Sequence, residues 1–501
     1  MQTLQDLIAL VNDRLGWVLI VVLIAVALYL TIRTGVVQLR MLPEMFRVIG
    51  ESPGENKDGT KSISSFKAFW ISAASRVGTG NIAGIALAIS IGGPGAIFWM
   101  WLMAIFGAAT AFVESTLGQL YKVKDKDSYR GGPAYYMSVG LKQPWMGAFF
   151  AVIITVTYGL VFNSLQANSI VDATATSLNV DTTQSFWLPV GLGIFLALVT
   201  GAVFLGGVQR ISAWSSVIVP VMAGAYLLLG ILVVAMNITE VPAMIALIFE
   251  NAFGIQSVVG GGIGIVILQG IRRGLFSNEA GMGSVPNAAA TSSVSHPAKQ
   301  GLVQSLGVYF DTILVCSITA FIVLLSNPVY DEAQGASLTQ TALASQLGTW
   351  AVHFLTVAIF LFAFSSILGN YYYGEANISY LFKKNARPAI MTYRLIVMAA
   401  VFTGSVIALP LAWSAADVFM SIMALTNLVA VFLLGRIALK VLKNYTAQRK
   451  QGLEPVFNRD DLPGVTGIDA WDGSDEVTTR AYWEKKDAAK GAKGAKGAQT
   501  R

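Results

Sequence analysis

Two short stretches of glycine and polar residues interrupt long apolar runs in this sequence of 501 residues. The first extends from Ser75 to Asn81, inside the apolar run from Phe66 to Ile89. In a membrane helix, an unwound turn here would leave backbone groups in need of partners, because no water satisfies them. Free amides at the start of a half-helix attract a carboxylate, whereas free carbonyls and an amide side chain suit Na⁺. An amino acid presents one end to each kind of partner, so this stretch predicts a site for an amino acid and sodium.

The second stretch extends from Gln269, within an apolar run, to Gly283, in a polar segment. Gln269 and Gly270 are expected to face the same site. Arg272, Arg273 and Glu279 are expected to form a gate on the inside or to anchor a helix. A role for the two arginines as ligands of a substrate carboxylate is the weaker alternative.

Two further apolar runs carry polar or aromatic residues one helical turn apart. Ser366 and Asn370 form one such pair, and Phe162 and Gln166 form the other. Residues four apart share a helix face, so each pair can line a cavity. A serine hydroxyl in a membrane helix can instead bond to the carbonyl four residues earlier, and for Ser366 both interpretations stay open.

Glu114 and Asp311 are the acidic residues deepest in the predicted spans. A carboxylate near the bilayer centre costs roughly 2.5–3.5 kcal/mol, so each should face protein, water or an ion. We expect a structural hydrogen-bonding role for Glu114, and either structure or cation attraction for Asp311. His296 and His353 lack metal-ligand spacing, and the sequence has neither a nucleotide-binding loop nor a serine elbow. The chain is therefore not expected to be an enzyme or to hold an organic cofactor.

The composition predicts an all-α polytopic membrane protein. With 54% hydrophobic and 12% charged residues, the chain carries more apolar surface than a water-soluble fold can bury. Its apolar runs are long enough to cross the ~30 Å hydrocarbon core as helices. About eleven spans are predicted, at Leu15–Thr34, Phe66–Ile89, Ala96–Tyr121, Trp145–Ser169, Trp187–Phe204, Ile211–Met236, Val258–Leu275, Gly301–Leu325, Trp350–Tyr373, Leu395–Leu409 and Ala415–Leu439.

The basic residues alternate along the chain from one connection to the next. The net charge of +6 therefore reflects membrane orientation and does not indicate a partner nucleic acid. Positive-inside reasoning predicts a multi-pass protein of the plasma (inner) membrane, with the N-terminus outside and the C-terminus in the cytoplasm. The basic connections contain Arg33, Arg40, Arg47, Lys57, Lys61, Lys67, Lys122, Lys124, Lys126, Arg130, Lys142, Lys383, Lys384 and Arg387.

The order of the spans predicts two inverted repeats of five helices each. We expect an N-terminal helix and connection over 1–65, a first repeat over 66–237, and a second repeat over 258–442. Between the repeats, 238–257 is expected to be an external connection with an interfacial helix, and 443–501 a disordered cytoplasmic tail. Each repeat opens with a glycine-rich helix, which points to a transporter binding site, although close helix packing is the alternative.

At these motifs the chain resembles the alanine or glycine:cation symporter family, also called sodium:alanine symporters. The resemblance covers nearly all of 15–439, and four motifs carry it: Val-Gly-Thr-Gly-Asn-Ile-Ala-Gly at 77–84, Gly-Pro-Gly-Ala-Ile-Phe-Trp-Met-Trp at 93–101, Arg-Gly-Gly-Pro-Ala-Tyr-Tyr at 130–136 and Gly-Leu-Phe-Ser-Asn-Glu-Ala-Gly at 274–281. It implies a leucine-transporter-like fold of the amino acid, polyamine and organocation type, in which the first helix of each repeat unwinds.

The resemblance also implies roles for particular residues. Sodium would lie between the carbonyls of Ala74 and Val77 and the hydroxyls of Ser365 and Ser366. The substrate carboxylate would meet Thr79 and Gly80, with Asn81 beside them. The complete expected substrate site is Thr79, Gly80, Asn81, Phe162, Gln166, Gln269, Gly270, Phe276, Ser366 and Asn370.

One departure from the family concerns substrate choice, because many alanine-selective members resemble one another in carrying Trp where this chain has Asn370. A carboxamide in place of an indole enlarges the pocket and adds a donor and an acceptor, so glutamine is a candidate substrate beside alanine and glycine. The expected function is sodium-driven uptake of a small neutral amino acid. Proton coupling through Asp311 or Glu114, a non-transporting sensor and a passive channel are the alternatives, and the oligomeric state is open.

Overall fold

The protein is described by a computed structural model that covers residues 2–51, 63–125, 128–182, 184–253, 262–327, 335–407, 409–486 and 488. Within these residues, nine helices are long and apolar enough to cross a membrane, and one bent pair of shorter helices raises the number to ten. α13 (Gly262–Asn278) is a further helix of 17 residues that begins directly after a segment outside the described ranges. The predicted all-α membrane fold is confirmed, and these helices agree with about eleven spans.

The first half of the chain contains four spans that are single continuous helices and two spans that contain a π-helical turn. π-Helical turns interrupt the second span at η1 and the fourth at η3, a feature often found at functional sites. The elements are α1 (Gln2–Arg33), α2 (Val37–Arg40), α3 (Leu42–Ile49), α4 (Ser65–Arg76), η1 (Gly80–Gly84), α5 (Ile85–Gly92), α6 (Ala96–Leu120), β1 (Val123–Asp125), β2 (Ser128–Arg130), α7 (Pro133–Tyr135), η2 (Tyr136–Gly140), α8 (Pro144–Val156), η3 (Thr157–Phe162), α9 (Asn163–Leu178), α10 (Trp187–Phe204) and α11 (Gly207–Met236).

The second half begins with a short apolar helix, α12, at the position expected for an interfacial helix. The last span is the long helix α20, which continues well beyond the predicted end of its apolar run. The elements are α12 (Val241–Ala252), α13 (Gly262–Asn278), α14 (Val285–Ala290), α15 (Pro297–Val308), η4 (Tyr309–Cys316), α16 (Ser317–Leu325), α17 (Ala336–Leu347), α18 (Trp350–Phe382), η5 (Lys383–Asn385), α19 (Ala386–Val406), α20 (Leu409–Lys450), η6 (Arg459–Asp461) and η7 (Glu476–Thr478).

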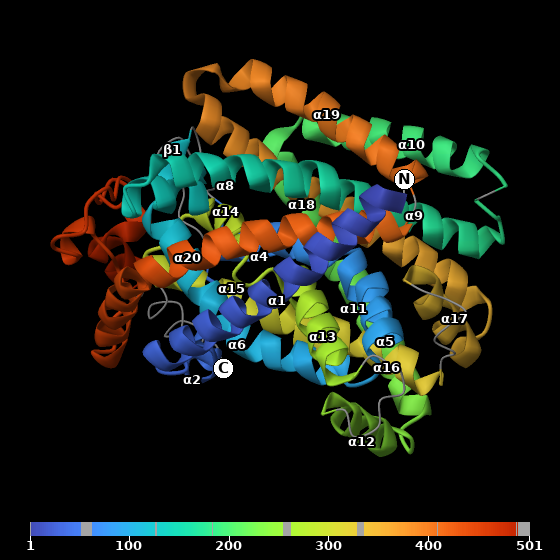
Figure 1. Cartoon of the computed structure of the whole chain (residues 1–501). Helices are drawn as coiled ribbons and strands as arrows, with labels where there is room; N and C mark the ends of the chain where they lie inside the picture. Colours follow the sequence, from blue (N-terminus) through green and yellow to red (C-terminus); the bar gives the residue numbers. More distant parts are fainter. Residues whose placement is uncertain are drawn as a thin grey trace, which may run out of the picture.

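Two groups of helices surround the middle of the protein. α6 packs against α13, α14 and α15, and α18 packs against α4, α8, α9 and α11. α10 and α19 form a pair on the outside of the second group, and α1 lies along α20 (Figure 1). The interrupted helices α4–η1–α5 and α13–α14 therefore lie between the two groups, where both can contact them.

The first predicted break occurs where the sequence places it. α4 ends at Arg76, and the chain bends by 54° before the helix resumes at Gly80. A side chain at Gly78 would collide with Ser366 Oγ, so the close approach of α18 requires glycine there. Unwinding at the Gly-Thr-Gly-Asn motif is confirmed.

The second break lies at the end of the predicted region 269–283, beyond the glycines that were expected to interrupt the helix. α13 continues through Gly270 and Gly274 to Asn278, and the helix is interrupted only over 279–284. A side chain at Gly270 would meet the Ala96 carbonyl, so this glycine serves close helix packing, which was the alternative interpretation. The glycine-rich prediction was thus wrong in position, and its residues 258–261 lie outside the described ranges.

Glu114 on α6 holds the second break in place. Its carboxylate accepts hydrogen bonds from Gly281 N–H at 3.0 Å, Gly283 N–H at 3.1 Å and Asn427 Nδ2 at 2.8 Å. Both glycines have positive φ, 90° and 80°, a conformation that glycine adopts without steric cost. The predicted structural role of Glu114 therefore agrees with its contacts.

The predicted disorder of the tail from Lys443 is wrong for 443–486. α20 continues to Lys450, and the chain beyond it folds against the end of the bundle near β1 (Figure 1). Phe457, Trp471 and Trp483 are buried in this segment. The polar composition suggested disorder, but three large aromatic side chains supply enough apolar surface to hold the segment in place. Residue 487 and residues 489–501, with the Gly-Ala-Lys repeats, lie outside the described ranges.

Replacement of Glu114 by Ala should destabilise the protein strongly, because two buried backbone amides and Asn427 would lose their acceptor. Charge-assisted hydrogen bonds of this kind contribute about 1.5–3 kcal/mol each, so we expect a loss of about 3 kcal/mol or more. Thermal unfolding of the purified protein would measure it. Ser115→Ala is the matched control, because Ser115 is equally buried on the same helix and its hydroxyl has no partner among the described residues. Equal midpoints for the two variants would contradict the assigned role.

Candidate functional site

The broken turn between α4 and η1 is held by amide side chains. Gly78 N–H, which would bond to the Ala74 carbonyl in a continuous helix, instead donates to Asn81 Oδ1 at 2.9 Å. Thr79 N–H donates to Gln166 Oε1 on α9 at 3.2 Å. Asn81 and Gln166 therefore satisfy the freed amides, and the Ala74 carbonyl is released from its usual donor.

Asn81 connects this turn to an acidic residue. Its Nδ2 donates to Asp311 Oδ1 on η4 at 2.7 Å, and Ser277 Oγ on α13 donates to Asp311 Oδ2 at 2.6 Å. Thr312 Oγ1 lies 3.0 Å from the same Oδ2. Both carboxylate oxygens thus have donors, so the contacts account for Asp311 as a structural group, and its attraction for a cation stays a prediction.

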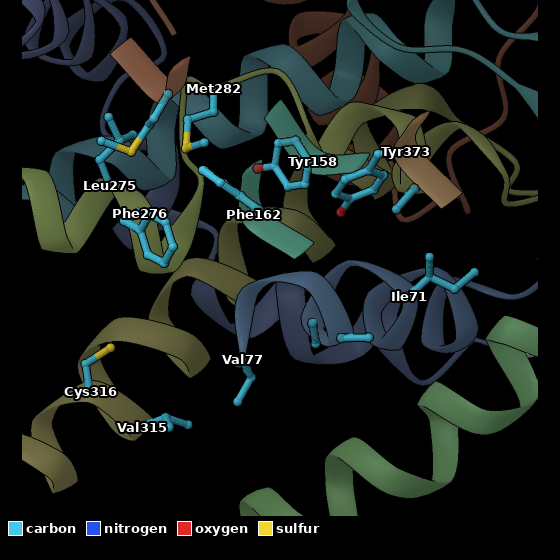
Figure 2. Packing of buried hydrophobic residues seen from close by; sticks show 14 of the residues in the cluster. Ile71, Val77, Tyr158, Phe162, Leu275, Phe276, Met282, Val315, Cys316 and Tyr373 are labelled. Carbon is cyan, nitrogen blue, oxygen red and sulfur yellow. The ribbon is translucent and has the colours of Figure 1, made fainter. Parts of the chain in front are cut away.

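Aromatic rings cover one side of the turn. Phe162 at the end of η3 lies 4.9 Å from Phe276 of α13 between ring centroids, with Tyr158 4.8 Å behind Phe162. Figure 2 shows Phe162 and Phe276 on neighbouring elements that face each other. A side chain at Gly80 would approach the Phe276 ring to 2.7 Å, so the ring rests on the backbone of the turn. The predicted residues Gly80, Phe162 and Phe276 are therefore brought together.

The polar face of α18 meets the turn from another direction. Ser366 Oγ faces Gly78, and it is buried without a hydrogen-bond partner among the described residues. Thr79 Oγ1 is likewise buried and unpartnered in that part of the chain. Two unsatisfied hydroxyls beside an unwound turn are unusual in a folded protein and mark a place where a ligand can supply the missing bonds.

Asn370, one turn further along α18, is fully engaged. Its Oδ1 lies 2.7 Å from Ser75 Oγ, and its Nδ2 donates to Asn163 Oδ1 at 3.1 Å. Ser75 Oγ also lies 2.9 Å from Glu279 Oε1, at the start of the second break. Asn370 therefore joins α4, α9 and α18 beside the site. Its bonds to Ser75 and Asn163 could not be predicted from the sequence, because the three residues are far apart in the chain.

The residues expected to hold sodium are partly suited to it. The Ala74 carbonyl and the Ser366 hydroxyl both lack their usual partners, as oxygen ligands of a hard cation must. Ser365 Oγ, in contrast, donates to the Phe362 carbonyl at 2.8 Å. The described residues contain no group of three or more His, Cys, Asp or Glu side chains able to hold a metal ion. Any cation at this place would therefore depend on backbone and hydroxyl oxygens.

The structure does not bring Gln269 and Gly270 to the broken turn. Gly270 packs against Ala96, and Gln269 lies beside Gly92, at the far end of α5. Gln269 lines a separate cavity of about 270 Å³, together with Asn12, Asp13, Leu87, Ile91, Arg272, Arg273, Gly335, Trp413, Ser414 and Asp417. The position of the helix break explains the error, because α13 continues for two more turns beyond these residues.

The two arginines close the end of the molecule near the start of α1. Arg272 Nη2 donates to the Asn12 carbonyl at 2.6 Å, and Arg273 forms a buried ion pair with Asp417. Arg273 also lies over the Trp413 ring, whose centroid is 5.1 Å from that of Phe276. With the N-terminus outside, as the charge pattern predicts, this is the outer end. An inside gate at these arginines and an outside N-terminus therefore cannot both hold, and the gate stays a prediction.

Two broken helices whose breaks meet between two groups of spans define a transporter with a leucine-transporter-like fold. The crystal structure of MhsT in complex with L-phenylalanine matches this arrangement with a TM-score of 0.50, over 79% of this chain and 90% of that one, at 15% sequence identity. This match concerns the fold alone.

The chain belongs to the sodium:alanine symporter family, whose model matches residues 1–459. It is 51% identical to the amino-acid carrier protein AlsT of Bacillus subtilis, over 93% of this chain and 98% of that protein. It is 48% identical to the probable sodium/glutamine symporter GlnT of Bacillus subtilis, over 95% and 98% of the two chains. It is 36% identical to the sodium/alanine symporter AgcS of Methanococcus maripaludis, over 89% and 99%. The protein is therefore a multi-pass membrane transporter and not an enzyme.

Gly78→Ala should disable the site, because the new methyl group would occupy the space of Ser366 Oγ. We expect uptake of labelled alanine or glutamine, whichever the parent transports, to fall at least tenfold, which corresponds to about 1.4 kcal/mol. Gly224→Ala is the control, since nothing lies within 4 Å of a side chain added there. Parent-like uptake by both variants would show that the turn does not need this close approach.

Proposed function

We propose that the chain is a sodium-coupled symporter that imports a small neutral amino acid by alternating access. The observation that carries the proposal is the pair of buried, unpartnered hydroxyls, Thr79 Oγ1 and Ser366 Oγ, beside the unwound turn at Gly78. Membership of the sodium:alanine symporter family supports the coupling ion. The names of the relatives, which include a sodium/alanine and a probable sodium/glutamine symporter, support the substrate class.

In this proposal the amino acid and sodium bind to opposite sides of the unwound turn between α4 and η1. The substrate carboxylate lies at the backbone of Thr79 and Gly80, where the amides of the resumed helix begin. Sodium lies on the opposite side of the turn, between the Ala74 and Val77 carbonyls and Ser366. Phe162 and Phe276 cover the bound substrate and exclude water. Entry of one sodium ion at 100 mV supplies about 2.3 kcal/mol for the uphill movement of the amino acid.

The proposed orientation places the N-terminus outside and the C-terminus in the cytoplasm. Arg47, Lys122 and Lys299 belong to the end of the molecule that the C-terminal segment covers, whereas Asp13 and Asp417 line the cavity at the other end. The lysines and arginines of the connections at the tail end support this orientation for a plasma-membrane protein, and the other end holds Arg272 and Arg273 within a span.

Proteoliposomes with an inward sodium gradient should accumulate labelled alanine or glutamine, and replacement of sodium by choline should abolish the accumulation. Ser366→Ala should raise the sodium concentration needed for half-maximal uptake about tenfold, because it removes a ligand oxygen. Ser216→Ala, at a half-buried serine of α11 whose hydroxyl donates to the Ala213 carbonyl, should leave the sodium dependence unchanged. Uptake that persists without sodium and follows a pH gradient would refute sodium coupling and favour the runner-up, a proton symporter in which the buried Asp311 carries the proton.

We further propose that glutamine is a substrate, because Asn370 leaves room and polar partners where an indole would fill the pocket. The carboxamide of glutamine could join the chain of Ser75, Asn370 and Asn163 side chains beside the turn. Asn370→Trp should therefore lower glutamine uptake at least tenfold and spare alanine uptake. Equal effects on the two substrates, or none on glutamine, would contradict this role of Asn370.

A further inference from the structure

The C-terminal segment 451–486 contacts connections from both halves of the chain. Phe457 N–H donates to the Ser295 carbonyl at 2.9 Å, in the connection between α14 and α15. Trp471 Nε1 donates to the Gln119 carbonyl at 3.1 Å, at the end of α6. The segment therefore forms a bridge between the first half, at α6, and the second half, at the start of α15.

One carboxylate oxygen of Asp475 bonds to connections from both halves of the chain. Its Oδ2 accepts from Tyr129 Oη of β2 at 2.9 Å and from Ser293 Oγ before α15 at 2.6 Å. Tyr129 belongs to the connection between the third and fourth spans, and Ser293 to the connection that leads into α15. An ionised acceptor strengthens both bonds, so Asp475 fastens one connection to the other.

Trp471 closes the same interface over a buried lysine. Its ring is completely buried, and Lys122 Nζ lies 4.5 Å from its centroid and 3.9 Å from that of Tyr129. Lys122 Nζ also donates to the Ser292 carbonyl at 2.9 Å. Lys122 thus reaches across from α6 to the connection before α15, and the tail residue Trp471 covers it.

A third set of contacts links the tail to the chain that precedes α4. Lys299 Nζ, with no solvent-exposed surface on its side chain, lies 2.6 Å from Glu51 and forms an ion pair with Glu454 of the tail. Trp483 lies over the same ammonium group at 4.6 Å. Glu51 and Trp483 line a small pocket with Ser65, the first residue of α4. The tail therefore lies over the start of α4, the broken helix that carries the candidate site.

We propose that residues 451–486 form a latch that holds the tail side of the transporter closed and must detach before that side can open. Alternating access requires the two halves to move relative to each other around the central site. The segment bonds to α6 and to the α14–α15 connection, which belong to one group of helices. Through Glu454 it also bonds to Arg47 and to Lys299, and Lys299 holds Glu51 in the chain that leads into α4. It therefore resists separation of α4 from α15 at this end of the molecule. Because the tail lies outside both repeats, its release can control opening without a change in the substrate site.

A cysteine at Ser72 can report opening of the tail side. Ser72 lies two turns into α4, is fully buried and hydrogen-bonds to Gln304 of α15, so a thiol there reacts only when α4 and α15 separate. The reporter is introduced into the full chain without other changes, and the parent measures the background from the buried Cys316. A membrane-impermeant maleimide is added to the side on which a C-terminal tag is accessible, in the absence of sodium and substrate, so the result is independent of the proposed transport activity.

Asp475→Asn and Trp471→Ala should each increase the rate of Ser72→Cys labelling from the tail side by about fivefold, the size expected when one hydrogen bond of ordinary net strength, about 1 kcal/mol, is lost or weakened. Thr466→Ala is the matched control, since Thr466 is an exposed residue of the same segment. Rates equal to this control in both variants would overturn the latch. Equal increases from both sides would also overturn it, because they indicate general loosening. If Trp471→Ala fails to fold, the milder Asp475→Asn decides the matter.

Discussion

Backbone amides exposed by two helix breaks must find partners inside the protein, and the arrangement of the side chains around the centre follows from this constraint. No lipid or bulk water can satisfy these groups at membrane depth. At the first break, Asn81 and Gln166 accept from Gly78 and Thr79. At the second, the Glu114 carboxylate accepts from Gly281 and Gly283. Each break thus depends on a polar side chain that accepts from its free amides, and burial of that side chain would be costly if the amides were absent.

The two breaks differ in whether the polar groups around them all have hydrogen-bond partners. The second uses both carboxylate oxygens of Glu114, and its remaining acidic group, Glu279, accepts from Ser284 at 2.6 Å. The first leaves the hydroxyls of Thr79 and Ser366 without partners among the described residues. A ligand therefore gains more at the first break, whereas the second is equipped to act as a hinge.

Direct bonds connect the two breaks to each other. Asn81 after the first break and Ser277 before the second both donate to Asp311. Ser75 before the first break bonds to Glu279 at the start of the second. A change in one turn, such as binding of a ligand, must therefore alter the partners of the other. This coupling gives a physical route from occupation of the site to movement of α13.

The sequence predicted the first break better than the second for a physical reason. At Gly78, the neighbours Thr79 and Asn81 supply polar groups that a packed helix would not bury, so unwinding was the better interpretation. Gly270 and Gly274 also have polar neighbours, but they pack closely against Ala96 and Met100, and sequence alone does not distinguish this packing from unwinding. The actual break needs Glu114, which lies more than a hundred residues away in the sequence. A pairing of that kind becomes visible only when the helices are placed beside one another.

The same limit applies to the tail, where local composition suggested disorder. Trp471 packs against Phe457 of its own segment, but the other partners of Trp471 and Asp475, which are Lys122, Tyr129 and Ser293, lie in two distant connections. The alternation of basic connections, in contrast, is a local signal, and it placed these connections at one end of the molecule.

The two ends of the transporter are closed by different means. Near the start of α1, the groups that lie across the end are Phe276, Trp413 and the Arg273–Asp417 ion pair, all carried by the spans themselves. At the other end, a separate segment lies across the connections between the spans. Closure by side chains of the moving helices changes whenever those helices move, so it responds directly to the occupied site. Closure by an appended segment contributes a free energy that does not depend on whether the site is occupied. Sequence changes within the tail can therefore alter the balance between the two open states while the binding residues stay the same.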